Sequence, residues 1–475
     1  MIFATLEATD SVQALRRLDI EELLLPVLIQ LVVIIIVARV FGLLFRAVGQ
    51  PTVVGEILAG ILMGPSLFGA LFPETFSAVF QPDLPGISAE LAAAAFPKIF
   101  QVLAQLGLIF LLFLIGLEFD FGHLRARGKS AVAICVVGTG LPFLLGAGIA
   151  PLIHPHLEPH PNGRVVPLFG MTLFLGTALS ITALPILGRM MIEMGITRTK
   201  LATVVITAAA VGDVIGWVML ATVAALAKVG TGGFDPWQTV AMIGQTILFA
   251  VVVMFFVRPL LCRYFSSALR MNGGELSLTS LAVLLVSLLL SALVTNMIGI
   301  FAIFGAFILG AILSDQPELR RAAGERIRAF VTALFLPIVF TYTGLRTEIS
   351  TLNSLLLWLI CVAVIAAALT GKFLGCAIAA RITGFNTRES AIIGIMMNTR
   401  ALMELIVINV GYDLGVIPQS LFCMLVIMAV LTTLITSPII LAFRRGTELE
   451  EPIAQSGFLS PCLAAAPIVK STESE

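Results

Sequence analysis

Charged residues are scarce in this sequence. Of its 475 residues, 12% are Asp, Glu, Lys or Arg, whereas 59% are hydrophobic, and the mean hydropathy is +1.07. Soluble domains carry about 25% charged residues. The composition therefore excludes an ordinary soluble domain and indicates a protein that crosses a membrane many times. The net charge is zero, which offers no general attraction to a nucleic acid.

Cysteine and histidine are also few, with six and four residues. No cysteine pair has the spacing of a metal site, so we interpret the cysteines as small apolar residues. His154, His156, Glu158 and His160 form a cluster, but prolines break the spacing that a metal site needs. The H-E-x-x-H motif of a zinc hydrolase is missing. The sequence therefore predicts no metal site, no cofactor and no enzyme.

The hydrophobic residues form long continuous runs, unlike the alternating strands of a membrane β-barrel. Because a spanning helix needs about 20 apolar residues, we predict an all-α polytopic membrane protein. Its thirteen predicted transmembrane helices lie near residues 22–45, 52–72, 99–118, 129–153, 166–188, 200–227, 239–262, 276–295, 298–314, 330–346, 354–380, 389–411 and 417–443.

The basic residues in the short connections indicate the orientation. With the N-terminus outside, eighteen lysines and arginines fall on the inside and six, Arg346 among them, on the outside. This asymmetry follows the positive-inside rule. We therefore expect an outside N-terminus and a cytoplasmic C-terminus. Residues 1–445 form one predicted membrane domain, and residues 446–475 a short cytoplasmic tail that we expect to be disordered.

Four ionisable residues lie well inside the predicted spans. Asp213, in "AAAVGDVIGW", is near the middle of 200–227; Lys372 lies in "LTGKFLG", and Arg400 and Glu404 lie in "MMNTRALMELIV". A charge at the bilayer centre costs at least about 2.5–3.5 kcal/mol, so each is a candidate functional residue. The alternative is a structural role: Arg400 and Glu404 are four apart and can pair on one helix face, and Lys372 can be the partner of Asp213.

Two of the predicted spans contain helix breakers. In the fifth, "FLGTALSITALPILGR" combines a proline with hydroxyl side chains, and the twelfth contains "MNTR". Broken helices at matching positions, seven spans apart, are typical of transporters built from two inverted six-helix repeats with the ion site between them. The alternative is that these small residues only allow tight helix packing.

These residues suffice for a mechanism of exchange. Burial favours the neutral, protonated form of the Asp213 carboxyl group, and a nearby cation favours the ionised form. The carboxylate can thus hold a proton or a monovalent cation, with hydroxyls of Thr177, Ser180 and Thr182 and the freed carbonyls of the fifth span as further ligands. Alternating access at this site gives cation/proton exchange. The alternatives are a cation channel and a transporter of another small solute.

The motifs occur in a familiar order. "PTVVGEILAGILMGPSLFG", "LGLIFLLFLIGLEFD", "GTALSITALPILGRM", "AAAVGDVIGWVML", "FAIFGAFILGAILS", "LTGKFLG" and "MMNTRALMELIV" together resemble the monovalent cation:proton antiporter-2 family. This family includes bacterial potassium-efflux and sodium/proton antiporters and plant cation/proton exchangers. The resemblance covers residues 25–443, and "GLRTEI" and "MNTRALMELIVINVG" look most like the plant branch.

The resemblance implies a homodimer in which each chain has a dimer domain and a mobile core domain with two crossing broken helices. It places Asp213 at the ion-binding aspartate, Ser180 and Thr182 on the unwound stretch, and Lys372 at a core lysine that pairs with the acid in some members. It also implies the bacterial inner membrane as the location. Nothing in the chain resembles the nucleotide-binding regulatory domain of the potassium-efflux members.

The sequence departs from the family pattern before the aspartate. Many sodium/proton members have a second acid there, and others have Asn or Gln, but this chain has Gly212. A single acid implies 1:1 electroneutral exchange of K⁺ or Na⁺ for a proton. Two roles for Lys372 stay open: it can hold Asp213 when the site is empty, or lose its own proton in the cycle and make transport electrogenic.

Overall fold

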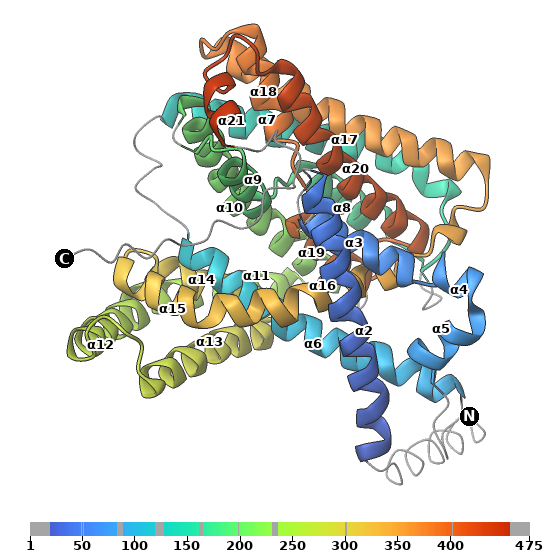
Figure 1. Cartoon of the computed structure of the whole chain (residues 1–475), viewed down its shortest axis with the longest axis horizontal. Coiled ribbons are helices and arrows are strands. Elements are labelled where there is room, and N and C mark those ends of the chain that lie inside the picture. The colour runs from blue at the N-terminus through green and yellow to red at the C-terminus, as the bar shows by residue number, and fades with distance from the viewer. Residues whose placement is uncertain are drawn as a thin grey trace, which may run out of the picture.

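A computed structural model describes residues 20–456 except 49, 51, 83–88, 119–127, 161–164, 198, 230–235, 300–301 and 401. All the regular elements formed by these residues are helices, and these residues contain no strand. The helices form two bundles (Figure 1). The broken-helix bundle consists of α7 (Gly128–Ile153), α8 (Leu168–Ser180), α9 (Leu184–Glu193), α10 (Lys200–Val229), α17 (Leu355–Ile382), α18 (Thr387–Met396), α19 (Leu402–Asp413), α20 (Gln419–Phe443) and α21 (Glu450–Gln455).

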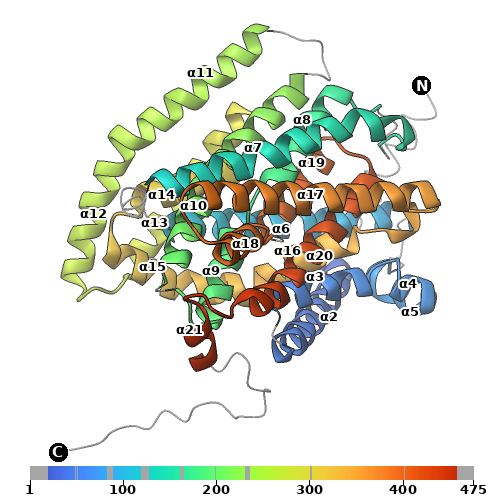
Figure 2. The same cartoon turned by 90° about the horizontal axis from the view of Figure 1, so that it is seen from above.

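The continuous-helix bundle contains α2 (Ile20–Ala47), α3 (Thr52–Met63), α4 (Phe68–Leu71), α5 (Pro73–Phe80), α6 (Ala89–Glu118), α13 (Leu278–Ile298), α14 (Ala302–Leu313), α15 (Pro317–Phe330) and α16 (Leu336–Leu345). The π-helical turn η4 (Val331–Phe335) joins α15 to α16, and η3 (Val253–Val257) joins α11 (Pro236–Val252) to α12 (Arg258–Met271). Helices α11 and α12 run along one edge of the molecule (Figure 2). Two short 3₁₀ helices, η2 (His154–His156) and η5 (Ile349–Thr351), complete the described elements.

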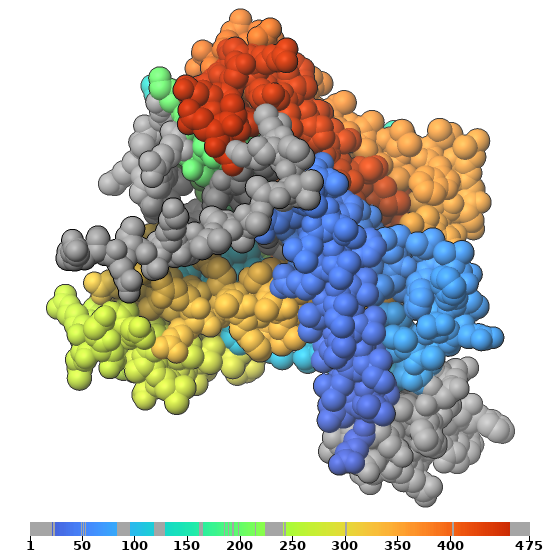
Figure 3. All heavy atoms as spheres, viewed as in Figure 1, coloured from blue at the N-terminus to red at the C-terminus, as the bar shows by residue number. Residues whose placement is uncertain are grey.

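Each of the thirteen predicted spans coincides with one helix or with consecutive helices, which confirms the predicted fold class. Within the described residues, ten helices are long and apolar enough to cross a membrane. The other three predicted spans are the short α14 and the two broken helices, α8–α9 and α18–α19. Helix α2 lies on the face of the molecule that Figure 3 shows. It exposes apolar side chains, for example Leu25 and Leu43, that suit contact with lipid.

The interruptions lie in the fifth and twelfth predicted spans, as the sequence predicts. Helix α8 ends at Ser180, and Ile181 is extended, with φ −73° and ψ 145°. Pro185 is the second residue of α9, where its missing N–H removes no helix hydrogen bond. Helix α18 ends in a tight turn in which the N–H of Thr399 donates to the carbonyl of Met396 at 3.1 Å. Both breaks leave main-chain groups that need partners inside the membrane.

The predicted tail begins with a folded segment. Leu449 and Ile453 are fully buried in a cluster with Met194 and Leu201. A carboxylate oxygen of Glu448 accepts a hydrogen bond from the N–H of Leu201, in the first turn of α10, where a negative charge stabilises the helix. Residues up to 456 therefore belong to the folded chain, unlike the disordered tail expected from 446, and residues 457–475 lie outside the described part.

Close packing of α6 against α14 gives a first prediction. A Cβ added to Gly310 would lie 2.2 Å from the main-chain oxygen of Phe113, which cannot move aside as a side chain does. Gly310→Ala should lower stability by about 1–3 kcal/mol through overpacking. Gly148→Ala is the matched control, because that position in α7 has open space. Thermal unfolding in detergent measures both; equal unfolding temperatures would contradict the prediction.

Candidate functional site

The two interrupted segments are joined by hydrogen bonds. The N–H of Ala183 donates to the carbonyl of Thr399 at 2.9 Å, and the hydroxyl of Thr182 donates to the carbonyl of Met397 at 3.2 Å. Segments about 215 residues apart in the chain thus satisfy each other's main-chain groups. This contact is the crossing of the broken helices.

Two buried, positively charged side chains, those of Arg400 and Lys372, cap the C-terminal end of α8. The guanidinium of Arg400 donates to the carbonyls of Ala178 at 3.0 Å and Leu179 at 2.6 Å, and the ammonium of Lys372 donates to the carbonyl of Ser180. A helix C-terminus carries partial negative charge, so positive groups stabilise it. Three of the freed carbonyls that the sequence suggested as cation ligands, those of residues 178, 179 and 180, are therefore already bound to side chains of the protein.

Arg400 has a partner for each of its five N–H groups. Besides the two α8 carbonyls, it donates to Glu404 at 3.1 Å, to the side chain of Asn398 at 3.4 Å and to the carbonyl of Ala368 at 3.4 Å. Arg400 and Glu404 are both fully buried and form the ion pair that their spacing of four predicts. The second carboxylate oxygen of Glu404 is buried without a hydrogen-bond partner among the described residues.

Asp213 lies in α10 and is 3% exposed. In the described part of the chain, neither of its carboxylate oxygens has a hydrogen-bond partner. The positive charge of Lys372, on α17, acts on it from nearby. An ionised carboxylate without a hydrogen bond is unfavourable in a buried site. Binding a proton or a cation would therefore stabilise this group.

Two glycines of α10, Gly212 and Gly216, lie within three residues of Asp213 in the chain. A Cβ on Gly216 would lie 3.0 Å from the Ile181 side chain, so α10 packs closely against the first break. A Cβ on Gly212 would meet only the sulfur of Cys135, at 3.8 Å. The position before Asp213 therefore has room for at least the first atom of a side chain.

The three predicted hydroxyl ligands donate to the main chain. Thr177 donates to Leu173 within α8, and Thr182 donates across the crossing as described. The single hydroxyl proton of Ser180 has two carbonyls within reach as alternative acceptors, that of Gly176 and that of Thr139 on α7. Each hydroxyl oxygen keeps lone pairs that can accept a bond or bind a cation. No described contact joins these three hydroxyls to Asp213. The structure thus brings Lys372, Arg400 and Glu404 to the crossing but leaves the cation-ligand role of the hydroxyls as a prediction.

Other polar residues at the crossing are absent from the predicted site. The hydroxyl of Thr433, on α20, accepts a hydrogen bond from the N–H of Arg400 at 3.2 Å. Asn398 is fully buried, and its amide nitrogen has no partner among the described residues. The only signal for them in the sequence is a polar residue in the middle of a predicted span.

The sequence matches known proteins over most of its length. The family model for the transmembrane part of sodium/hydrogen exchangers matches residues 32–443. The Na⁺/H⁺ antiporter NhaS4 of Synechocystis sp. is 38% identical over 425 residues, covering 88% of this chain and 97% of the relative. Cation/H⁺ antiporter 18 of Arabidopsis thaliana is 34% identical over 87% of this chain, which spans only 48% of that relative.

A solved structure has the same fold. The sodium proton antiporter MjNhaP1 from Methanocaldococcus jannaschii superposes with a TM-score of 0.58 over 90% of this chain and 98% of its own, at 17% sequence identity. At that identity the likeness concerns the arrangement of the helices, not the identity of the transported ion.

Proposed function

Since this chain belongs to the sodium/hydrogen exchanger family, we propose that it exchanges Na⁺ or K⁺ for protons across a membrane by alternating access, with Asp213 as the binding group that both ions share. The relatives are named antiporters, and antiporters are transporters rather than enzymes. The observation that carries the proposal is the buried Asp213 carboxylate, which has no hydrogen-bond partner in the described residues. A proton or a small cation satisfies it in turn.

The ligands of the bound cation follow from the crossing. Hydroxyl oxygens of Thr177, Ser180 and Thr182, together with Asp213, supply the oxygen ligands that hard cations prefer. Because the carbonyls at residues 178, 179 and 180 already accept bonds from Arg400 or Lys372, the hydroxyls carry more of the coordination than the main chain does. Arg400 and Glu404 hold the crossing in shape as supporting charges.

The buried charges favour electroneutral exchange. Asp213 and Glu404 are acids, Lys372 and Arg400 are bases, and all four are at most 3% exposed. With all four ionised the site is neutral. Binding one monovalent cation, or instead one proton, raises its charge to the same value. The two loaded forms then carry equal charge, so a 1:1 exchange moves no net charge as long as Lys372 keeps its proton.

Proteoliposomes containing a pH-sensitive dye test this function. Addition of Na⁺ or K⁺ to one side should move protons in the opposite direction, and Li⁺ extends the comparison. A membrane potential alone should drive no proton flux, although 100 mV is worth about 2.3 kcal/mol per charge moved. Flux driven by the potential would show that Lys372 releases its proton; absence of any cation-dependent proton movement would refute the exchange itself.

The proposal extends to the organisation of the protein. Residues 1–445 form the transport domain, and residues 446–475 form a cytoplasmic segment whose first part, up to 456, packs against that domain. The chain works as a homodimer in the bacterial inner membrane with its N-terminus outside. The excess of basic residues in alternate connections supports this orientation. The apolar side chains exposed on surface helices support a membrane setting and leave helix faces available to a second copy.

A further inference from the structure

Arg346 joins the two bundles at one end of the molecule. It caps the C-terminal end of α16, in the continuous-helix bundle. Its guanidinium donates to the carboxylate of Asp413 at 2.7 Å and to the side chain of Asn409 at 3.0 Å, both on α19 of the broken-helix bundle. Its own carbonyl accepts a hydrogen bond from Gln419, the first residue of α20. One residue thus binds two helices of the other bundle.

Further bonds between the bundles surround this residue. Gln101, on α6, donates to the second carboxylate oxygen of Asp413 at 3.2 Å, and Asn409 donates to the hydroxyl of Thr343, on α16, at 2.8 Å. The guanidinium carbon of Arg346 also lies 4.7 Å from the ring centre of Tyr412, within range of a cation–π contact. We call Arg346, Gln101, Asn409, Asp413 and Gln419 the Arg346 cluster.

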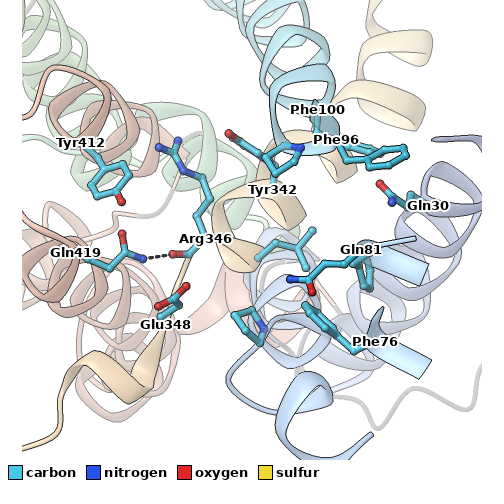
Figure 4. A pocket seen from close by; sticks show the side chains of 14 residues that line it. Gln30, Phe76, Gln81, Phe96, Phe100, Tyr342, Arg346, Glu348, Tyr412 and Gln419 are labelled. Carbon is cyan, nitrogen blue, oxygen red and sulfur yellow. Dashed lines mark hydrogen bonds between the residues drawn. The ribbon is translucent and has the colours of Figure 1, made fainter. Parts of the chain in front are cut away.

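A cavity of about 480 Å³ lies beside the Arg346 cluster, between the two bundles. Figure 4 shows Phe76, Phe96 and Gln30 on one side of it and Tyr412 and Gln419 on the other, with Arg346 between. The side-chain oxygen of Gln419 is buried there without a hydrogen-bond partner among the described residues. The bundles are therefore already separated by a cavity next to the Arg346 cluster. The hydrogen bonds of the cluster connect the two bundles beside this cavity.

We propose that the Arg346 cluster is a lock that holds the two bundles together at this end and opens when the end becomes accessible. The proposal rests on the alternating access of the proposed function. The charge distribution predicts this end to be outside, since Arg346 lies in an outside connection. In this proposal the two bundles part at this end, so that α16 and α6 separate from α19 and α20. Their separation requires the five bonds to break together.

The strength of the lock follows from its partial burial. The side chains of Arg346 and Asp413 are 18% and 20% exposed. An ion pair at a fully exposed site contributes little, but this pair is mostly buried and combines charge-assisted bonds with an aromatic contact. Such a lock is strong enough to bias the closed form and weak enough to break during transport.

Thiol labelling of the cavity tests the lock. Phe100 lines the cavity and is 4% exposed, so Phe100→Cys reports its opening. In nanodiscs, where a sulfonated maleimide reaches both faces, labelling of residue 100 is quantified by mass spectrometry of its peptide. Arg346→Gln should increase the labelling rate by about tenfold or more, as expected when two charge-assisted hydrogen bonds are lost. Arg321→Gln removes an exposed arginine that pairs with Glu325 in its own helix and does not line the cavity, and it should leave the rate unchanged.

A charge exchange sharpens the test. The double variant Arg346→Asp with Asp413→Arg should label more slowly than either single variant, because the opposite charges face each other again. Equal labelling in the Arg346→Gln and parent proteins, both monodisperse and equally stable, would overturn the lock. The labelling assay does not depend on transport. Faster labelling without any cation/proton exchange would uphold the lock and refute the proposed function. Intact exchange with unchanged labelling would uphold the proposed function and refute the lock.

Discussion

Asp213→Asn should reduce cation-dependent proton flux to the level of empty liposomes while the protein still folds. Asparagine has nearly the same shape as aspartate but cannot carry a proton on and off or balance a cation. The carboxylate in the structure is 3% exposed and has no hydrogen-bond partner in the described residues, so the substitution removes no described bond. We expect an unfolding temperature that is unchanged or higher, because an unpartnered buried charge is lost.

Two variants of α10 serve as controls. Asp213→Glu keeps the carboxyl group on a chain one methylene longer and should retain some exchange. Thr207→Val changes the same helix at a position whose described hydroxyl bond is to the carbonyl of Thr203 within that helix. This variant should exchange at the parent rate. If Asp213→Asn kept full cation-dependent flux in a pH-dye assay, Asp213 could not be the shared site.

Arg400→Met should give the largest loss of stability. The guanidinium binds two carbonyls at the end of α8, a third carbonyl on α17 and the carboxylate of Glu404, all within the buried crossing. A methionine leaves these groups without their donor, and removing one partner of a buried ion pair costs about 3–5 kcal/mol. We expect a poor yield and a lower unfolding temperature in detergent.

The pair Arg321–Glu325 provides a matched comparison. It has the same spacing of four and a similar distance of 3.0 Å, but its side chains are 82% and 67% exposed. Arg321→Met should therefore change stability by no more than about 0.5 kcal/mol. The double variant Arg400→Met with Glu404→Met should recover part of the lost stability, because no unpaired carboxylate is left. An Arg400→Met protein as stable as the parent would contradict the role that the contacts assign.

The fold could be read largely from the order of the side chains. Runs of apolar residues indicate helices because lipid leaves the main chain no other partners, and each predicted span coincides with helical structure. The breaks were also visible, since proline and short polar side chains interrupt the runs at 166–188 and 389–411. The boundary between 276–295 and 298–314 corresponds to Gly299, whose φ of +104° ends α13 in a conformation that favours glycine.

The partners at the crossing could not be read in this way. The spacing of four predicts that Arg400 pairs with Glu404, but its bonds to the carbonyls of Ala178 and Leu179 join residues more than 220 positions apart. Main-chain carbonyls are the same at every residue, so no pattern of side chains identifies which of them accepts a given bond. The same holds for Lys372 and the carbonyl of Ser180.

The sequence by itself determined the helical membrane fold, the positions of the two breaks and the isolation of Asp213 in an apolar span, because these depend on local composition and on the cost of charge in lipid. Only the tertiary structure decided that the carbonyls ending α8 are bound by Arg400 and Lys372, that Asp213 is left without a hydrogen-bond partner in the described chain, and that Arg346 ties the bundles together. These features depend on which distant groups meet when the helices pack.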